Sequence, residues 1–464
     1  MKFIGKHIAN IIPVMYLLAG IVVWFATRAF YFEGDSAMHY LIARYAPQHP
    51  DLYFDHWGKP FFTLVASPFA QFGQSGMVLF NLFCMALSAW LTYRVAENLK
   101  VRYPLFVPVL FLFTPFVFIT TLSGLTEPFS ALMFSLALFF FSSNRHWQAA
   151  LVLSFLPFCR SEGLVLISGF AFLFLWRRKW LPLVLLAAGT VVYSLAGWLV
   201  GKNVLWAFTE IPYANLNSRY GSGEWFDFAV GLQYVTGIPV YLLLILGLLF
   251  TILLLVRKRI SLFSDELFSG LIPFLLFFAF HTVAWATGSF SSMGLKRVFV
   301  TALPSMVLLA ARGMEWPITL IPKGKTAKII TALILAYVIV FPFTPNPAAF
   351  QYPCEFRCKP EHVIFKAVAD SEWIKDKRIC CTHPFMAVYA NRDPFDTNSY
   401  MLLHEWRPEM AAKNDVLIWD NWFAVVESNI GLEGLQGNPD LLLRKEMQLE
   451  YCGRTGQVVL FTVR

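Results

Sequence analysis

Long apolar runs separated by short polar segments fill the first 345 positions of this chain. A helix needs about 20 apolar residues to cross a bilayer. Runs near that length occur at 8–26, 77–95, 181–200, 238–256 and 268–287, and shorter ones at 105–119, 128–141, 298–311 and 329–343. The first run is long for a signal peptide and no small-residue cleavage site follows it. We therefore interpret it as a retained first transmembrane helix.

One stretch breaks this regular pattern. The segment from Arg145 to Arg177 has basic residues at both ends, so both ends are expected on the cytoplasmic side. It is too short for two full spans, which would need about 40 residues. We predict two short helices that meet partway up the membrane, with Arg160 and Glu162 near their junction. Irregular backbone at that depth needs protein or a wet cavity beside it.

Basic residues mark one side of the predicted membrane domain. Arg177-Arg178-Lys179, Arg257-Lys258-Arg259 and the lysines at 323, 325 and 328 all fall on the same side when the spans are counted. This is the cytoplasmic side by the positive-inside rule. It places the N-terminus in the cytoplasm and gives about 11 membrane segments, short helices included.

Composition supports the membrane assignment. The chain has 464 residues, 57% hydrophobic and 14% charged, whereas soluble domains have about 45–50% apolar and about 25% charged residues. The net charge of +8 lies at the ends of apolar runs and not along one polar face. We therefore expect no nucleic-acid partner.

The composition changes after about residue 345. Charged residues return, and the segments 378–382, 415–419 and 457–463 are typical of strands, whereas 360–373 and 439–448 are typical of helices. The prediction is an α-helical polytopic membrane protein, residues 1–345 with a first external loop at 28–60. A small extramembrane α/β domain, residues 346–464, follows on the external side.

Seven cysteines fall in two groups. Cys84 and Cys159 lie in membrane segments, where we expect them to be apolar packing residues. The others lie in the external domain, where disulfides are permitted: Cys354, Cys358, Cys380, Cys381 and Cys452. Cys354 and Cys358 could pair with each other or with the 380–381 strand. A zinc site is the alternative, but no second Cys-x-x-Cys or close histidine pair supports it.

The first external loop is rich in acids and histidines. Asp35 and His39 are four positions apart, so a helix starting there would place both on one face. Further along are Asp55, His56 and Lys59, with aromatic residues between the charges. The alternative interpretation is a solvated loop in which Asp35 is a helix N-cap. The aromatic residues favour a functional loop.

Two short motifs in this loop resemble a known superfamily. Gly34-Asp35-x-x-x-His39-Tyr40 and Trp57-x-Lys59-Pro60 resemble the GT-C glycosyltransferases, closest to the protein O-mannosyltransferases and the lipid A aminoarabinose transferases. Members take a sugar from a polyprenyl-phosphate carrier on the external face. The aminoarabinose branch carries Lys-Pro-Pro, where Phe61 replaces the second proline here, and paired acids, where Ser36 follows Asp35.

The resemblance implies roles for Asp35 and Lys59, and the positions of other polar side chains in the predicted topology suggest further candidates. Asp35 matches the catalytic acid position, and Glu127, next to Pro128, is a second acid or simply a residue of a helix end. Candidates for holding the donor phosphate are Lys59, Arg160, Lys296 and Arg297. Candidates for contacting the substrates are His39, Asp55, His56, Glu162, Arg219 and Tyr220.

Several of these residues have simpler alternatives. Lys296 and Arg297 could extend to lipid headgroups, and Arg160 and Glu162 could pair only with each other. Asp35, His39, Asp51, Asp55 and His56 could hold a divalent ion, although no metal and no cofactor is expected.

The expected activity is transfer of a sugar from a polyprenyl-phosphate donor to an acceptor hydroxyl on the external face. A single general base with direct displacement would invert the anomeric centre. One alternative is a transporter or flippase of a lipid-linked or polar substrate, because charged residues inside a membrane also mark substrate paths. Another is a non-catalytic assembly protein. The expected location is a bacterial plasma membrane, with the endoplasmic reticulum as the alternative. The acceptor is expected to be a glycan, a lipid or a protein.

Overall fold

The computed structural model describes residues 2–31, 33–212, 218–321, 324–350, 359–410, 412–413, 415–451 and 453–464. The chain forms two compact units. The first, which we call the helical unit, comprises residues 1–29 and 53–350. The second, the α/β unit, comprises residues 30–52 and 351–464. The segment 30–52, which carries Asp35, thus belongs to the same unit as the C-terminal residues.

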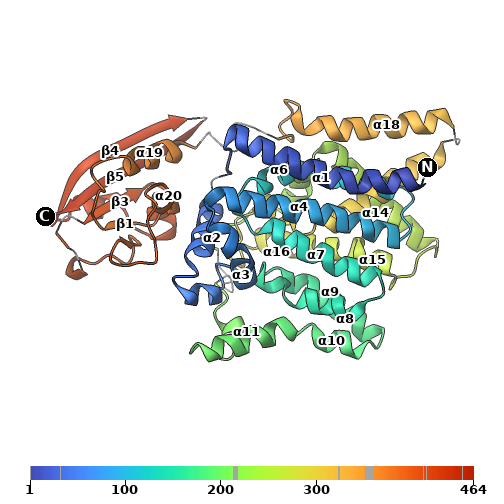
Figure 1. Ribbon diagram of the computed structural model, residues 1–464, viewed down its shortest axis with the longest axis horizontal. Coiled ribbons are helices and arrows are strands. Elements are labelled where there is room, and N and C mark those ends of the chain that lie inside the picture. The colour runs from blue at the N-terminus through green and yellow to red at the C-terminus, as the bar shows by residue number, and fades with distance from the viewer. Residues whose placement is uncertain are drawn as a thin grey trace. The chain divides into compact units, whose positions relative to one another are not determined.

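The helical unit is a bundle whose long helices lie side by side (Figure 1). Its α-helices are α1 Lys2–Thr27, α3 Pro60–Ala70, α4 Gly73–Asn98, α5 Val107–Leu112, α6 Pro115–Thr121, α7 Glu127–Ser142, α8 His146–Ser154, α9 Gly163–Trp176, α10 Trp180–Leu185, α11 Ala188–Leu199, α12 Trp206–Thr209, α13 Asp227–Thr236, α14 Ile238–Val256, α15 Asp265–Ser269, α16 Leu271–Ala286, α17 Leu303–Leu320 and α18 Lys325–Val340. Short 3₁₀ turns link some of them: η2 Pro104–Phe106, η3 Leu156–Phe158, η4 Lys296–Val300 and η5 Phe341–Phe343. Another, η1 Pro50–Phe54, lies at the boundary of the two units.

Many of these helices have the length and composition of membrane spans. Five segments of the described chain qualify: Asn10–Thr27, Gly73–Asn98, Trp180–Leu199, Ile238–Val256 and Lys325–Phe343. The pair Pro104–Leu112 and Pro115–Thr121, bent by 61°, makes a sixth if it is one span. Shorter apolar helices are Pro60–Ala70, Glu127–Ser142, Gly163–Trp176 and Leu271–Ala286. The predicted α-helical polytopic fold is confirmed.

The unusual stretch between Arg145 and Arg177 forms the predicted pair of short helices. The helix α8 ends at Ser154, η3 follows, and α9 begins at Gly163. Arg160 and Glu162 lie in the turn between η3 and α9, as expected. The single helix expected at 105–119 is instead broken between α5 and α6, where Pro115 begins the second piece. Proline cannot donate an amide hydrogen bond, so a break at this position costs little.

A tight crossing of α14 and α17 anchors the helix that follows η4. A Cβ on Gly247 would lie 1.9 Å from the carbonyl oxygen of Leu309, and one on Gly313 would lie 1.9 Å from that of Leu243. Only glycine allows the two backbones to approach this closely. Because α17 begins at Leu303, this contact also restrains η4 and the arginine that it carries.

The α/β unit contains one five-stranded sheet in the order β2-β1-β3-β5-β4. The strands are β1 Ile379–Cys381, β2 Tyr400–Met401, β3 Val416–Asp420, β4 Leu441–Tyr451 and β5 Arg454–Val463. The helices are α2 Gly34–Tyr45, α19 Pro360–Ala369, α20 Pro384–Tyr389 and α21 Leu432–Gln436, with a 3₁₀ turn η6 Pro408–Met410 and a π-helix η7 Phe423–Glu427.

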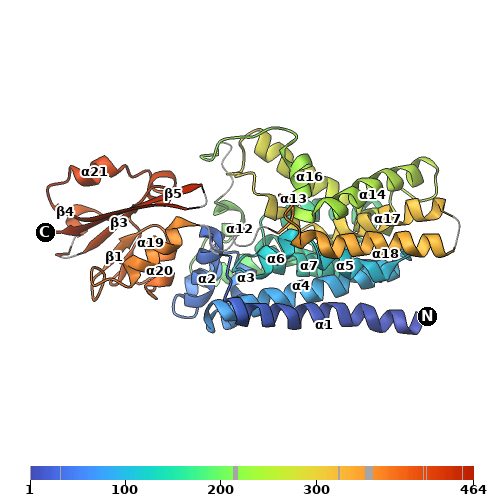
Figure 2. The same cartoon turned by 90° about the horizontal axis from the view of Figure 1, so that it is seen from above.

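The sheet is covered on both faces. Strands β2, β1 and β3 run parallel to one another, whereas β5 is antiparallel to its two neighbours, β3 and β4. All five residues of β3 are buried, which is typical of a strand covered on both sides. Figure 2 shows α19 and α20 on one face and α21 on the other. The predicted strands at 378–382, 415–419 and 457–463 and the helix from Pro360 are confirmed.

One prediction in this unit is wrong. The segment 439–448 was expected to be helical but forms most of β4, which pairs with β5 from Leu441 to Tyr451. Its Leu, Arg, Lys, Glu, Met and Gln residues favour helix. The long antiparallel pairing with β5 overrides that preference, and most β4 side chains remain exposed, which weakens the strand pattern.

Candidate active site

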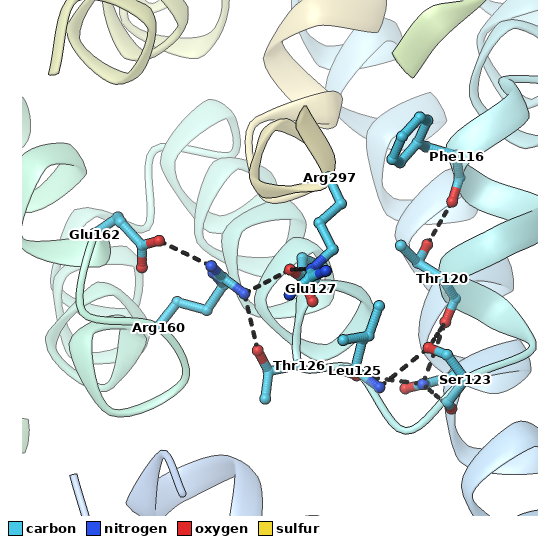
Figure 3. A network of polar contacts seen from close by, with 10 residues as sticks. Phe116, Thr120, Ser123, Leu125, Thr126, Glu127, Arg160, Glu162 and Arg297 are labelled. Carbon is cyan, nitrogen blue, oxygen red and sulfur yellow. Dashed lines mark hydrogen bonds and ion pairs between the residues drawn. The ribbon is translucent and has the colours of Figure 1, made fainter. Parts of the chain in front are cut away.

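The site is built on a turn that precedes α7. The side-chain amide of Asn81, fully buried on α4, donates to the carbonyl oxygens of Ser123 at 2.7 Å, Leu125 at 3.3 Å and Thr120 at 3.4 Å. These hydrogen bonds replace the partners that an irregular turn would otherwise lack. The turn ends at Glu127, the first residue of α7 (Figure 3).

Glu127 is the centre of a buried ion-pair network. Its carboxylate is fully buried, and Oε1 lies 2.7 Å from Nη1 of Arg160 and 3.1 Å from Nε of Arg297. Arg160 also donates to Oε1 of Glu162 at 2.8 Å and to Oγ1 of Thr126 at 3.1 Å. Figure 3 shows Arg160 between the two glutamates, with Arg297 reaching Glu127 from η4. Three separate segments thus converge.

Lys59 lies beside this network. It immediately precedes α3, is only 5% exposed, and its Nζ lies 3.4 Å from Oγ of Ser161, the residue between Arg160 and Glu162. Its backbone is left-handed, with φ of 63°. This conformation is uncommon for residues other than glycine and is concentrated at functional sites. The structure therefore brings together five of the predicted residues: Lys59, Glu127, Arg160, Glu162 and Arg297.

Asp55 and His56 shape the loop that leads to Lys59. Asp55 Oδ1 accepts a hydrogen bond from the amide of Trp57 at 2.7 Å. The His56 ring lies 4.9 Å from the ring of Trp206 and 6.4 Å from that of Phe158. Burial, and secondly the charge of Lys59, lower the pKa of His56 to about 4. The neutral His56 ring can therefore pack between Trp206 and Phe158, and this packing holds the residues before Lys59 in place.

Two neighbouring basic residues point in different directions. Arg297 is buried against Glu127, whereas the ammonium of Lys296 lies 4.2 Å from the centre of the Tyr234 ring on α13. The two were grouped in the sequence, but the 3₁₀ turn η4 sends adjacent side chains to different neighbours.

Arg219 and Tyr220 lie before α13, in a segment hydrogen-bonded to the residues that follow α16. Ser218 donates its amide to Gly288 and its hydroxyl to the carbonyl of Ser292, at 2.6 and 2.9 Å. Trp285 Nε1 donates to Asp227 at 2.7 Å. Ser218 and Asp227 thus connect the described residues on either side of Arg219 and Tyr220 to residues 285–292, at the end of α16.

Asp35 and His39 lie on α2 in the α/β unit. Glu33 occupies the N-cap position, so Asp35 lies inside the first turn and the N-cap alternative is wrong. His39 follows one turn later and is buried, which confirms that a helix carries both. A Cβ on Gly34 would lie 2.4 Å from Cζ of Phe423, so a larger residue directly before Asp35 would have to displace the Phe423 ring.

The described cysteines and possible metal ligands bear on the disulfide and metal alternatives raised by the sequence. Cys84, Cys159, Cys380 and Cys381 are buried and free, so no disulfide joins the 380–381 strand. Cys354, Cys358 and Cys452 lie outside the described residues. Within the described part of the chain, no group of three or more His, Cys, Asp or Glu side chains could hold a metal ion.

Sequence reasoning missed two residues of this site. Asn81 is polar within a long apolar helix, and such a residue needs buried partners, so its position was a usable signal. Ser161 carried no signal, because a serine between Arg160 and Glu162 has no motif of its own. Its hydroxyl nevertheless connects Lys59 to the network.

Comparison with known proteins identifies the fold. No protein-family model and no curated protein sequence matches this chain. Among solved structures, ArnT from Cupriavidus metallidurans bound to undecaprenyl phosphate is similar, with a TM-score of 0.61 and 13% identity over 96% of this chain and 97% of that one. Its apo structure gives a TM-score of 0.58 and 12% identity over the same shares. This chain therefore has the GT-C fold of ArnT, as the motifs of the first loop predicted.

Proposed function

From the GT-C fold and the buried basic cluster, we propose that this protein is a glycosyltransferase that uses a polyprenyl-phosphate sugar. It transfers the sugar to an acceptor hydroxyl on the external face of a bacterial plasma membrane, with the N-terminus in the cytoplasm. The observation that carries the proposal is the convergence of Lys59, Arg160 and Arg297 in a fold whose solved example was crystallised with undecaprenyl phosphate.

The charges of the cluster suit a phosphodiester. Three cations, Lys59, Arg160 and Arg297, face two carboxylates, Glu127 and Glu162, which leaves one net positive charge. A polyprenyl-phosphate sugar carries one negative charge on its phosphodiester. After transfer, the released polyprenyl phosphate carries up to two. Basic groups fixed in a water-poor site stabilise a charge that grows during the reaction.

The reaction would proceed by direct displacement. The carboxylate of Asp35 takes the proton of the acceptor hydroxyl as its oxygen forms a bond to the anomeric carbon. The bond from that carbon to the phosphate oxygen breaks, and the phosphate leaves with the electron pair. One displacement inverts the anomeric centre. No metal or cofactor enters this scheme.

Glu127 has a different role in this proposal. Its Oε1 is shared by two guanidinium groups, so proton transfer through this oxygen would break both contacts. Holding Arg160 and Arg297 at a fixed separation fits the geometry better. We therefore assign Glu127 as a positioning residue, and Asp35 as the general base.

Binding of the carrier tests the phosphate site. With purified protein in nanodiscs, Arg297→Gln and Lys59→Gln are expected to weaken undecaprenyl phosphate binding about tenfold or more, equivalent to about 1.4 kcal/mol. Lys296→Gln is the matched control, because it removes a neighbouring charge that lies on Tyr234. Equal affinity in all three variants would remove the phosphate site from the proposal.

Measurement of sugar transfer tests the assignment of Asp35 as the general base. Labelled polyprenyl-phosphate sugars would be supplied to membrane vesicles, and release of polyprenyl phosphate would be measured. Asp35→Asn is expected to bind the carrier normally and to lose turnover at least 100-fold. Retained turnover would contradict the assignment of Asp35. Movement of intact labelled lipid across the bilayer without release would instead favour the transporter alternative.

A further inference from the structure

The carboxyl ends of three parallel strands meet at one edge of the α/β unit. The strand β1 lies between β2 and β3 and is parallel to both, so the chain winds to opposite sides of β1. Ligands of α/β sheets bind outside the carboxyl ends of the strands, at such a switch point. Thr382 follows β1, His404 lies just beyond β2, and Trp422 follows β3.

Polar side chains at this edge form a hydrogen-bonded row. Thr382 Oγ1 lies 2.9 Å from Ser428 Oγ, which in turn lies 3.4 Å from Nδ1 of His404. The two hydroxyls are half-buried and His404 is exposed. We call Thr382, Ser428 and His404 the hydroxyl row. Hydroxyl and imidazole groups both donate and accept hydrogen bonds, as the hydroxyl groups of a sugar do.

A π-helix adjoins the hydroxyl row. It is η7, Phe423–Glu427, and the amide of Ser428 closes it by donating to the carbonyl of Phe423 at 3.1 Å. Such turns are rare and are frequently found at functional sites. Here η7 follows Trp422, which is 47% exposed. An exposed indole beside hydrogen-bonding groups suits a ligand with both apolar and polar faces.

The same π-helix contacts the segment that carries Asp35. The Phe423 ring lies so close to Gly34 that a Cβ there would come within 2.4 Å of its Cζ. The helix α2 also packs on α20, which begins two residues after Thr382. Further contacts hold the segment: His49 Nε2 lies 2.8 Å from Asp393 Oδ2, and Arg44 donates to Asn391 at 2.9 Å. The helix with Asp35 and the hydroxyl row thus flank one π-helix within one unit.

We propose that this edge of the α/β unit binds the acceptor, a carbohydrate, through the hydroxyl row and Trp422, and presents its hydroxyl to Asp35. The proposal rests on the proposed function, because the role of Asp35 as the base comes from it.

Saccharide binding to the full-length protein tests this site. Protein in nanodiscs would be probed by saturation-transfer NMR with methyl glycosides of common hexoses, pentoses and amino sugars. At least one glycoside is expected to show transfer that falls fivefold or more in Trp422→Ala and in the double variant Thr382→Val, Ser428→Ala. Trp422→Tyr, which keeps an aromatic ring, is expected to retain most of the signal.

A tryptophan elsewhere in the same unit provides the control. Trp373 lies 5.9 Å from the guanidinium of Arg444 on β4, at the other edge of the sheet, and Trp373→Ala should leave the saccharide signal unchanged. The acceptor site is overturned if no glycoside shows transfer, or if Trp373→Ala and Trp422→Ala reduce it equally. Undecaprenyl phosphate binding, measured in the same samples, reports on the proposed function separately.

Discussion

At the scale of single residues, the buried carboxylate of Glu127 depends on two arginine partners. It is fully buried and shares one oxygen between Arg160 and Arg297, while its Oε2 has no hydrogen-bond partner among the described residues. Buried ion pairs recover their desolvation cost only when the geometry is good. The pairing partner Arg297 lies 170 positions away in the chain, so no local pattern could reveal this role.

Glu127→Gln is therefore expected to destabilise the protein. Removing one partner of a buried ion pair costs about 3–5 kcal/mol, because the remaining charges stay buried without compensation. A clearly lower Tm in detergent is the expected result. The control is Asp265→Asn, which breaks the more exposed pair with Arg177 and should cost about 1 kcal/mol or less. An unchanged Tm for Glu127→Gln would contradict the positioning role.

His56 predicts a pH dependence of stability. Its pKa is about 4 in the folded protein, against about 6.5 in an unfolded chain. The unfolded state therefore binds a proton first as the pH falls. The stabilisation is complete above about pH 6.5 and is lost towards pH 4, by up to about 3 kcal/mol. Tm measured against pH should fall less steeply over this range in His56→Phe than in the wild type. Parallel curves would refute the lowered pKa.

At the scale of elements, α2 belongs to the α/β unit although it follows the first helix of the helical unit in the sequence. Its sequence follows the first membrane helix, yet residues 30–52 group with residues 351–464. The contacts that hold it come from residues about 350 positions later, at Asn391 and Asp393. In the proposed mechanism, the α/β unit therefore sets the position of Asp35.

Asp393→Asn tests this coupling. Loss of the partly exposed pair with His49 should cost about 0.5–1 kcal/mol. Amide hydrogen exchange within residues 34–45 should then quicken about two- to fivefold. The double variant His49→Gln, Asp393→Asn should exchange no faster than Asp393→Asn alone, because the pair is already broken. Exchange in this helix that is insensitive to Asp393 would show that other contacts hold α2.

At the scale of the whole molecule, the basic clusters predict the side of the membrane on which the chain ends. Basic clusters at 177–179 and 257–259 follow α9 and α14 directly. By the positive-inside rule we expect these clusters in the cytoplasm and the C-terminus outside. Alkaline phosphatase fused at residue 464 should be active, and the same enzyme fused after residue 258 should be inactive. Green fluorescent protein at these sites should give the opposite pattern, and any other result would contradict the topology.

The sequence alone determined the features that depend on local chemistry. Apolar runs of about 20 residues can only be accommodated in a bilayer or a very large core, so the helices α4 and α14 were predictable. The buried strands β1 and β3 followed from short runs rich in Val, Ile and Cys. The motif around Asp35 and Lys59 pointed to the GT-C fold that the comparison with ArnT supports.

Only the tertiary structure decided the features that depend on distant partners. The helix-favouring segment of β4 became a strand because β5 pairs with it. Arg160 joined Glu127 as well as Glu162, and Lys296 separated from Arg297, because neighbouring helices offered each a partner. Hydrophobicity is a property of each segment and can be read along the chain. Pairing between segments is a property of the packed molecule, and the arginine network depends on it entirely.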